Sequence, residues 1–395
     1  MSGGAPEWEA REATRRARSD LAVCREGPTY MNLGGAGPLP DPAGEALIAE
    51  VRSGMRAGRG SLATVRRVEA AAASLRAQVA ALIGAQADEI ALTGNTTVGV
   101  NIGLWGIDWR PGDRIITTLL EHPGVSVPVA TIARRHGVEV DRISAAQARR
   151  DLAGAVRERC TARTRALVLS HVAYGTGEVL DVAGACRACG AAEGIIRIID
   201  GAQSVGAIPV DVSSLGADVY AFPAHKWLHG PEGLGALWVS RRIGERLEVT
   251  YSGYETGTGH TPAGGITPHP GARRHEPATL PFGLLTGWAA ALTWLEGFGW
   301  DHIHRRIRAG RAAAVAALQT IPDVHIELPS GPQAGLLTFR IGEHDPVWAA
   351  ARMVEAGVIV RWLPDPRALR ASIGLYWDEG DIERLARAVR AVRDC

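Results

Sequence analysis

Short apolar runs alternate with longer amphipathic stretches through the middle of the chain, from about residue 89 onward. The runs have the length of β-strands, and the stretches 96–105, 123–136 and 145–158 between them have helical spacing. Alternation of this kind predicts a mostly parallel sheet with helices on both faces. The seven predicted strands are Ile90–Leu92, Arg114–Thr118, Val138–Ile143, Ala166–Ser170, Ile195–Asp200, Asp218–Phe222 and Leu234–Ser240.

The rest of the pattern predicts a second, smaller α/β domain at the C-terminal end. A chain of 395 residues with 46% hydrophobic residues is long enough for two domains. We predict an N-terminal helix and arm over 1–30 that packs on the small domain, a large domain over 31–282 and the small domain over 283–395. The stretch 241–282 is rich in Gly, Pro, Thr and His and reads as irregular, and we expect its loop 252–275 to shape the pocket. The elements predicted for 283–395 are helices at 283–319, 346–356 and 379–393 and strands near 323–328, 335–341, 358–363 and 369–375.

The charge and cysteine content exclude several classes of protein. Lys plus Arg number 43 and Asp plus Glu 42, a balance that predicts neither a nucleic-acid nor a membrane partner. No apolar run is long enough to span a bilayer or to form a signal peptide. Cys186 and Cys189 form a lone CxxC, without the second pair or the histidines of a metal site, so we expect no metal and two thiols in a reducing cytoplasm.

The candidate chemistry lies at the ends of two predicted strands, where ligands bind in parallel sheets. One strand ends in Asp200-Gly201-Ala202-Gln203, and the strand that ends at Phe222 leads to Lys226, flanked by His225 and Trp227. The positive charge of this chain is overwhelmingly arginine, which cannot form an imine, whereas lysine can. We therefore predict that Lys226 forms a Schiff base with a cofactor.

The cofactor that this pattern favours is pyridoxal 5′-phosphate (PLP). PLP needs a lysine for its imine, an acid at the pyridine nitrogen, a planar side chain on the ring, and amides and hydroxyls for the phosphate. We assign these roles to Lys226, Asp200, His122 and the pair Thr96 and Thr97, which lies between a strand and a helix where a phosphate is favoured. Lys226, Asp200 and His122 are the predicted catalytic residues.

The ordered set D-G-A-Q at 200–203, H-K-W at 225–227 and G-x-x-G-x-G at 230–235 resembles the class V aminotransferase family. These are fold-type I PLP enzymes, a group that contains the cysteine desulfurases. Within the family the chain is most similar to cystine C–S lyases of the cyanobacterial type, in the stretches 30–35, 99–106 and 332–335. The resemblance covers roughly 28–394 and implies an α/β fold with a large, mostly parallel seven-stranded sheet and a small C-terminal domain.

The resemblance also implies roles for five further residues. Gln203 corresponds to a residue that hydrogen bonds to the phenolate oxygen of the cofactor, and His225 to one that contacts its phosphate. Thr279 matches a residue that reaches the phosphate of the partner subunit, which implies a homodimer. Arg370 matches the arginine that binds the substrate α-carboxylate, and Arg361 a second arginine suited to a distal carboxylate.

Two departures from the family pattern and one competing interpretation remain. Pro223 and Ala224 stand where many relatives have a hydroxyl residue and glycine, which predicts the loss of one phosphate contact. The stretch 170–177 lacks the asparagine that relatives often place near the cofactor oxygen, so that contact stays open. Ser170-His171 looks like a nucleophile with its base, but adjacent strand residues point to opposite faces, which argues against a hydrolase.

The reaction is less constrained than the cofactor. Sulfur transfer through an enzyme persulfide needs a thiol before the carboxylate-binding arginine, but 361–370 holds no cysteine and Cys395 is the last residue. β-Elimination needs no such thiol. We therefore predict a PLP-dependent C–S lyase that converts cystine, cysteine or a related sulfur amino acid to pyruvate, ammonia and a sulfur species. The alternatives are an aminotransferase or epimerase of specialised metabolism, and a non-catalytic PLP-fold binding protein, against which Lys226 and Asp200 argue.

Overall fold

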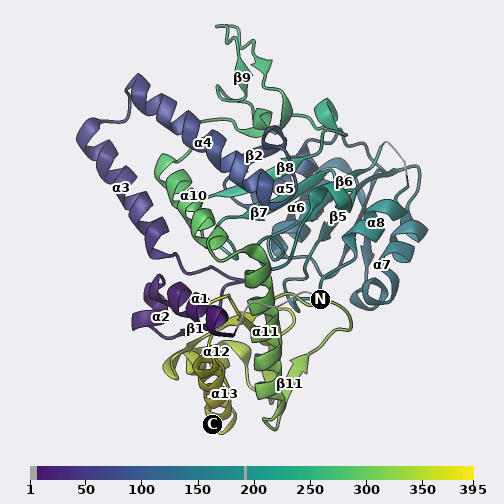
Figure 1. Ribbon diagram of the computed structural model, residues 1–395. Helices are drawn as coiled ribbons and strands as arrows, with labels where there is room; N and C mark the ends of the chain where they lie inside the picture. The colour runs from purple at the N-terminus through teal and green to yellow at the C-terminus, as the bar shows by residue number, and fades with distance from the viewer. Residues whose placement is uncertain (1–6, 191–193) are drawn as a thin grey trace.

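The computed structural model describes residues 7–190 and 194–395 of the chain. A seven-stranded sheet with helices on both faces makes up the larger part, and a four-stranded sheet with its own helices lies below it in Figure 1. Elements from both ends of the sequence, α1 (Glu7–Ser19) and α13 (Glu379–Arg393), lie at this four-stranded end. Residues 1–6, with which the predicted N-terminal arm begins, lie outside the described residues.

The large sheet contains all seven predicted strands in the order β2-β8-β7-β6-β5-β3-β4. The strands β3 to β7 run parallel to one another, whereas β8 is antiparallel to both of its neighbours. The prediction of a mostly parallel sheet is therefore confirmed. The strands are β2 (Ile90–Thr93), β3 (Arg114–Thr118), β4 (Glu139–Ile143), β5 (Thr164–Ser170), β6 (Ile196–Asp200), β7 (Val219–Pro223) and β8 (Gly235–Val239).

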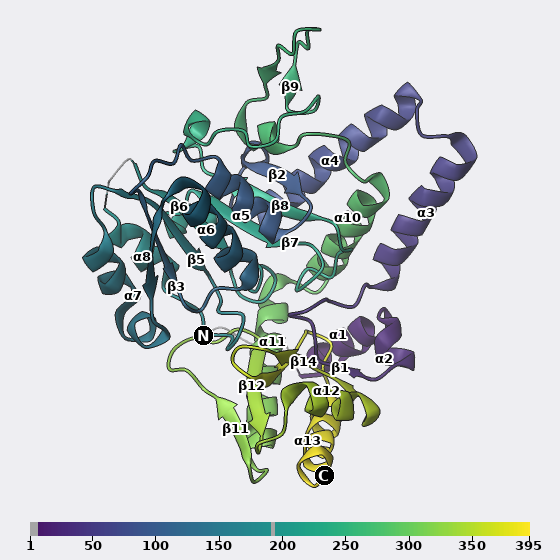
Figure 2. The same ribbon diagram turned by 180° about the vertical axis from the view of Figure 1, so that it is seen from behind.

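Successive residues of the central strands bury themselves under two different helix layers. Ile198 belongs to an apolar cluster with α5 and α6, whereas its neighbour Ile199 belongs to the cluster with α4, α7 and α8. This follows from the alternation of side chains along a strand, and it explains why successive residues in the middle of these strands are apolar. Figure 2 shows α5 and α6 lying across the strands. The helices are α4 (Leu62–Leu82), α5 (Thr96–Trp105), α6 (Pro123–His136), α7 (Ala145–Arg159) and α8 (Val182–Ala188).

Helix α10 (Phe282–Glu296) packs beside α4 and against α3 (Asp41–Ala57), as Figure 1 shows. Its buried residues Leu285, Trp288 and Leu295 lie in the same cluster as one face of the large sheet. The predicted boundary at 282–283 assigned this helix to the small domain, and that boundary stays a prediction. The packing places α10 with the large sheet, because its apolar face is covered there.

The four-stranded sheet is antiparallel throughout, in the order β11-β12-β15-β14, with a separate apolar core. The N-terminal segment joins it: β1 (Thr29–Tyr30) pairs with β13 (Val358–Ile359), and Arg18 of α1 lies 2.6 Å from Asp381 of α13. The remaining elements here are β11 (Val324–Glu327), β12 (Leu336–Ile341), β14 (Arg361–Leu363), β15 (Ala368–Ser372), α2 (Ala22–Glu26), α11 (Trp300–Gln319) and α12 (Pro346–Glu355).

The stretch predicted to be irregular, 241–282, contains more local structure than expected. A short antiparallel pair, β9 (Gly257–Thr258) and β10 (Thr267–Pro268), projects from the large domain in Figure 1. The same stretch contains the 3₁₀ turns η2 (Gly244–Arg246) and η3 (Gly271–His275).

Two short elements lie earlier in the chain, the 3₁₀ turn η1 (Ala87–Glu89) and the helix α9 (Val212–Leu215). Among the described residues, no helix is both long and apolar enough to cross a bilayer.

Candidate active site

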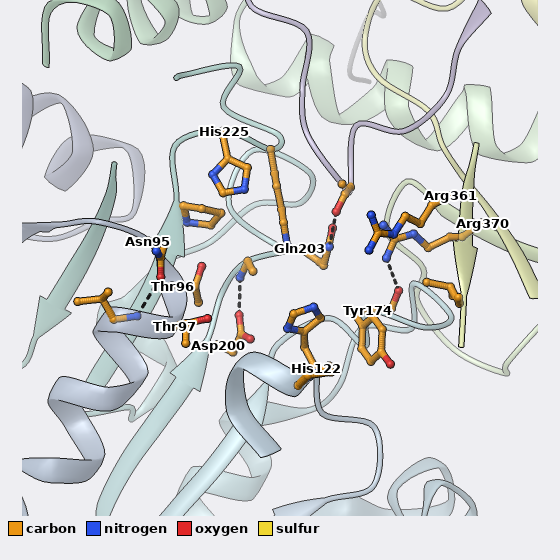
Figure 3. Close-up of a pocket in the computed structure, with 18 of the residues that line it drawn as sticks. Asn95, Thr96, Thr97, His122, Tyr174, Asp200, Gln203, His225, Arg361 and Arg370 are labelled. Carbon is orange, nitrogen blue, oxygen red and sulfur yellow. Dashed lines mark hydrogen bonds between the residues drawn. The ribbon is translucent and has the colours of Figure 1, made fainter. Parts of the chain in front are cut away.

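A cavity of about 550 Å³ lies where the carboxyl ends of the parallel strands face the four-stranded sheet. Nine of the predicted site residues line it, and Figure 3 shows most of them around one central space. Thr96, Thr97 and His225 lie on one side of this space, and the two arginines lie on the other. The nine residues are Thr96, Thr97, His122, Asp200, Gln203, His225, Lys226, Arg361 and Arg370.

Lys226 is the only lysine in the sequence, and it lies three residues beyond the end of β7. Its enclosure in the protein, together with the charges of Arg370 and Arg361, lowers the pKa of Lys226 to about 8, although Asp200 acts in the opposite direction. Within the described residues, no hydrogen bond or ion pair engages the Lys226 amine. An amine with this pKa is about half neutral at pH 8 and mostly neutral above it. The neutral form can act as a nucleophile or accept a proton.

Asp200 is the last residue of β6 and is almost completely buried. Burial raises the pKa of this carboxyl, while the N–H of Ala202, 2.8 Å from Oδ1, and the charge of Lys226 lower it. The remaining oxygen, Oδ2, has no hydrogen-bond donor in the described part of the chain. Asp200 can therefore accept a hydrogen bond from a cationic group that enters the cavity.

The opposite side of the cavity is suited to an anion. Asn95 caps α5 by accepting the N–H of Val98 at 3.0 Å, and the N–H groups of Thr96 and Thr97 have no acceptor among the described residues. Free N–H groups and the helix dipole favour a phosphate at this position. Nearby, Nδ1 of His225 is buried without a partner, and burial lowers the pKa of this imidazole.

His122 lies between a strand end and α6, whose start it caps. Its Nδ1 accepts the N–H of Gly124 at 2.9 Å, and Pro123 takes the first helical position. Burial, together with the charges of Lys226 and Arg370, lowers the pKa of His122 to about 4. The ring is therefore neutral, with its proton on Nε2, and can offer a flat face to a bound ring system.

The Gln203 side chain is held by the protein on both of its polar atoms. Its Nε2 donates to the carbonyl of Gly34 at 2.8 Å, and its Oε1 accepts the indole N–H of Trp227 at 2.8 Å. One N–H of the amide remains for a ligand. These contacts connect the D-G-A-Q and H-K-W segments to each other and to the loop at Gly34.

Arg361 and Arg370 stand directly opposite each other on β14 and β15. Arg370 is buried, donates from Nη1 to the carbonyl of Tyr174 at 2.7 Å, and leaves Nε without a partner. Burial and the charge of Arg361 lower the pKa of Arg370 to about 10. Like charges opposite each other are unfavourable in a sheet, so this pair is suited to an anionic ligand with one or two carboxylates.

Thr279 lies outside this cavity, and so does the whole of the loop 252–275. The cavity of the single chain thus gives no support to the expectation that this loop shapes the pocket, and the expectation stays a prediction. Thr279 instead lies at a surface groove, where its N–H donates to the hydroxyl of Tyr254 at 2.9 Å.

The competing interpretations gain no support from the geometry. Ser170 donates to Glu121 at 2.6 Å and His171 pairs with the Tyr220 hydroxyl at 2.8 Å, so serine and histidine do not form a nucleophile–base pair. Among the described residues that line the cavity there is no cysteine. Among the residues that the structure describes, no group of three or more His, Cys, Asp or Glu could hold a metal ion.

Sequence reasoning missed several residues at this site. Tyr174 lines the cavity and contacts His122 edge-on, with ring centroids 4.9 Å apart. The segment 34–37 also passes the site, and the N–H of Gly37 donates to the carbonyl of His225 at 2.6 Å. A Cβ at Gly37 would lie 2.3 Å from the carbonyl oxygen of Lys226, so only glycine fits there. The sequence signal was a Gly- and Pro-rich loop, with nothing to connect it to Lys226.

Comparison with known proteins agrees with this geometry. The family model described as aminotransferase class-V matches residues 40–385. A curated relative named "Probable cysteine desulfurase", from Methanothermobacter thermautotrophicus, is 29% identical over 88% of this chain and 86% of its own length.

Two solved structures of the protein C-DES are also similar to this chain. One is a variant with glycine covalently linked to the PLP cofactor, at a TM-score of 0.88 and 31% identity over 94% of this chain and 98% of that chain. The other is the cystine C–S lyase C-DES in complex with its reaction product cysteine persulfide, at a TM-score of 0.86 and 31% identity over 92% of this chain and 98% of that chain.

Proposed function

The chain belongs to the aminotransferase class-V family, and on that premise we propose that it is a PLP-dependent C–S lyase acting on cystine, cysteine or a related sulfur amino acid. The observation that carries the proposal is the convergence of Lys226, Asp200, Arg370 and Arg361 on a cavity whose described lining contains no cysteine. Relatives named cysteine desulfurase and cystine C–S lyase share the fold, and the missing thiol favours the lyase.

The groups around the cavity fit PLP. The free N–H groups at Thr96 and Thr97 and the unpartnered Nδ1 of His225 suit the phosphate, and Asp200 suits the pyridine nitrogen. The ring of His122 suits a stacking position, and Lys226 suits the covalent link. When bound, PLP supplies an aldehyde that forms an imine with an amine and a protonated ring that withdraws electrons from Cα of an amino acid.

The residues of this chain then perform the proposed steps. Arg370 binds the α-carboxylate and so orients Cα toward Lys226, whose lowered pKa lets the neutral amine take the Cα proton. Asp200 keeps the ring nitrogen protonated, and a sulfur leaving group departs from Cβ. For cystine, one molecule of substrate and one of water become pyruvate, ammonia and cysteine persulfide. Arg361 lies where it can bind the distal carboxylate of this longer substrate.

Incubation of the purified protein with cystine, cysteine and S-substituted cysteines tests the function. We expect pyruvate, ammonia and a sulfur species in equal amounts, without added keto acid and without a persulfide on the protein. A turnover that requires a keto acid and consumes it one for one would identify an aminotransferase. Inversion at Cα without elimination would identify an epimerase.

We also propose that the active unit is a homodimer in which Thr279 reaches the cofactor phosphate of the partner subunit. In support, Thr279 lies at a groove beside α3 and α4, which expose the large apolar side chains of Val51, Met55 and Leu62. Exposed apolar patches of this kind favour association. Sedimentation should give a dimer at micromolar concentration, and a fully active monomer with full cofactor occupancy would contradict this proposal. The domain ranges 1–30, 31–282 and 283–395 and the cytoplasmic location likewise remain predictions.

A further inference from the structure

Tyr174 stands between the active-site cavity and a second cavity. The second cavity has a volume of about 230 Å³, and its lining includes Glu121, Arg149, Thr176 and Pro366. Within the described residues, Tyr174 is the only one that lines both cavities. Its side chain contacts His122 of the first cavity and the carbonyl of Asp365 of the second, so it is placed as a wall between them.

Three contacts hold this wall in place. The ring packs edge-on against His122 at 4.9 Å, and the hydroxyl donates to the carbonyl of Asp365 at 3.1 Å, in the loop between β14 and β15. The backbone carbonyl accepts Nη1 of Arg370 at 2.7 Å. Tyr174 thus contacts the predicted ring-stacking residue, the predicted carboxylate-binding residue and the loop that connects the strands of the two arginines.

The second cavity is lined by apolar side chains together with a few polar ones. The Glu121 carboxyl on its lining accepts the hydroxyls of Thr118 and Ser170, each at 2.6 Å, and burial raises the pKa of Glu121 to about 7. Arg149 on the same lining lies 2.9 Å from Glu178 and is thereby partly neutralised. A neutral substituent fits this environment better than an anionic one, since Arg149, the one cation that the described residues contribute to the lining, is paired with Glu178.

We propose that Tyr174 is a specificity-determining residue, whose ring excludes bulky neutral groups on the substrate sulfur, whereas the charged second half of cystine extends toward Arg361. This inference rests on the proposed function. It adds that the site rejects one class of substrate, namely L-cysteines that carry a bulky neutral group on sulfur. Removal of the ring joins the two cavities and admits such substrates. The phenylalanine ring alone is sufficient as a wall, because the hydroxyl serves only the Asp365 contact.

The experiment compares four holoenzymes: wild type, Tyr174→Ala, Tyr174→Phe and Tyr30→Phe. Tyr30 is the matched control, because its hydroxyl also donates to a backbone carbonyl, that of Ala36 at 2.6 Å, but it lines neither cavity. Each protein is titrated with S-methyl-L-cysteine and S-benzyl-L-cysteine while the cofactor absorbance is followed, and pyruvate formation is measured in parallel.

We expect Tyr174→Ala to improve the apparent Kd of S-benzyl-L-cysteine relative to S-methyl-L-cysteine by at least about tenfold, a typical discrimination for a few carbon atoms in a pocket. Tyr174→Phe and Tyr30→Phe should keep the wild-type ratio. The same ratio in all four proteins would overturn the proposal. An equal change in the Phe and Ala variants would overturn it too, because the loop contact rather than the wall would then decide selectivity.

Failure of the proposed function has a different signature. An enzyme that forms no pyruvate from any sulfur substrate is not a C–S lyase, but the absorbance titration still reports which amino acids enter the cavity. If Tyr174→Ala does not fold, Tyr174→Leu replaces it as the variant without a ring, and the expected change in ratio is the same.

Discussion

Buried charged residues lie at or next to both ends of strands β6 and β7. At the amino end their hydrogen bonds are complete, whereas at the carboxyl end they are not. At the amino end, Arg197 and Asp218 pair at 3.4 Å, and Arg242 also binds Asp218. The guanidinium of Arg197 donates further to the carbonyls of Cys186 and Gly190, at 3.1 and 2.7 Å. At the carboxyl end, Asp200 keeps one oxygen without a donor, and the Lys226 amine has no partner in the described part of the chain.

The difference separates a structural charge pair from a functional one. A buried charge destabilises the fold unless its hydrogen bonds are satisfied, so the amino end contains a complete network. The carboxyl end leaves its charges incomplete, and burial then shifts their pKa values toward the neutral forms. Both ends therefore contain buried charged residues, but only the carboxyl end has charged groups without hydrogen-bond partners, and this is the end where we expect a ligand to bind.

The largest effect should follow Lys226→Ala. Turnover should fall by roughly 10⁴-fold, the upper range for a positioned general base, because no other lysine exists to replace it. Borohydride reduction of the wild-type holoenzyme should fix the cofactor on Lys226 alone, which peptide mapping by mass spectrometry can check. An adduct at the N-terminus, the other primary amine of the chain, would show that the cavity at the carboxyl ends of the strands does not hold the cofactor.

Replacing one acid at each end of the strands should separate catalysis from stability. Asp200→Asn should lower kcat by about a hundredfold or more, since each 1.4 kcal/mol of lost charge stabilisation is tenfold in rate. Asp218→Asn should instead lower the free energy of unfolding by about 3 kcal/mol, because Arg197 loses its partner. Urea unfolding and kcat per folded molecule measure both quantities. The comparison fails if the two variants lose activity and stability in the same proportion.

Replacing Arg361 and replacing Arg370 should lower kcat/KM to extents that depend differently on the length of the substrate. Arg361→Ala should cost about 2 kcal/mol in kcat/KM on cystine, roughly thirtyfold, and little on cysteine, which has no distal carboxylate. Arg370→Ala should affect both substrates alike, since both carry the α-carboxylate. Arg340→Ala is the control, because Arg340 lies on the neighbouring β12 and pairs with Glu327 at 3.4 Å, outside the cavity. If Arg361→Ala lowers kcat/KM equally on both substrates, Arg361 does not bind the distal carboxylate of cystine.

The smallest effect concerns pH. The neutral amine captures PLP, so the rate of capture by the apo protein should rise with pH and level off above the lowered pKa of Lys226, about 8. Arg361→Ala should move this midpoint upward, because the charge of Arg361 lowers that pKa. Stopped-flow absorbance against Nα-acetyl-lysine as the reference amine measures the shift. A protein whose rate follows the reference amine at every pH would show that Lys226 is not perturbed.

The strand pattern and the two central residues were accessible from sequence for a local reason. Apolar runs short enough for strands end at Asp200 and just before Lys226, and parallel strands bring such ends to one edge of the sheet. All seven strands and the convergence of nine site residues follow from this rule together with the family resemblance. The assigned roles of these residues still await the experiments above.

Other parts of the site depend on contacts between segments that are far apart in the chain. Local pattern did not connect Tyr174 with the loop at Asp365 or Gly37 with the segment at His225 and Lys226, because each contact joins loops that are far apart in the chain. The same limit applies to the loop 252–275, whose position relative to a pocket could not be derived from its composition. Residue type and periodicity therefore determined which side chains sit at strand ends, since a strand is a local structure. The tertiary structure decided which charges are satisfied and which remain open, because hydrogen-bond partners come from distant segments.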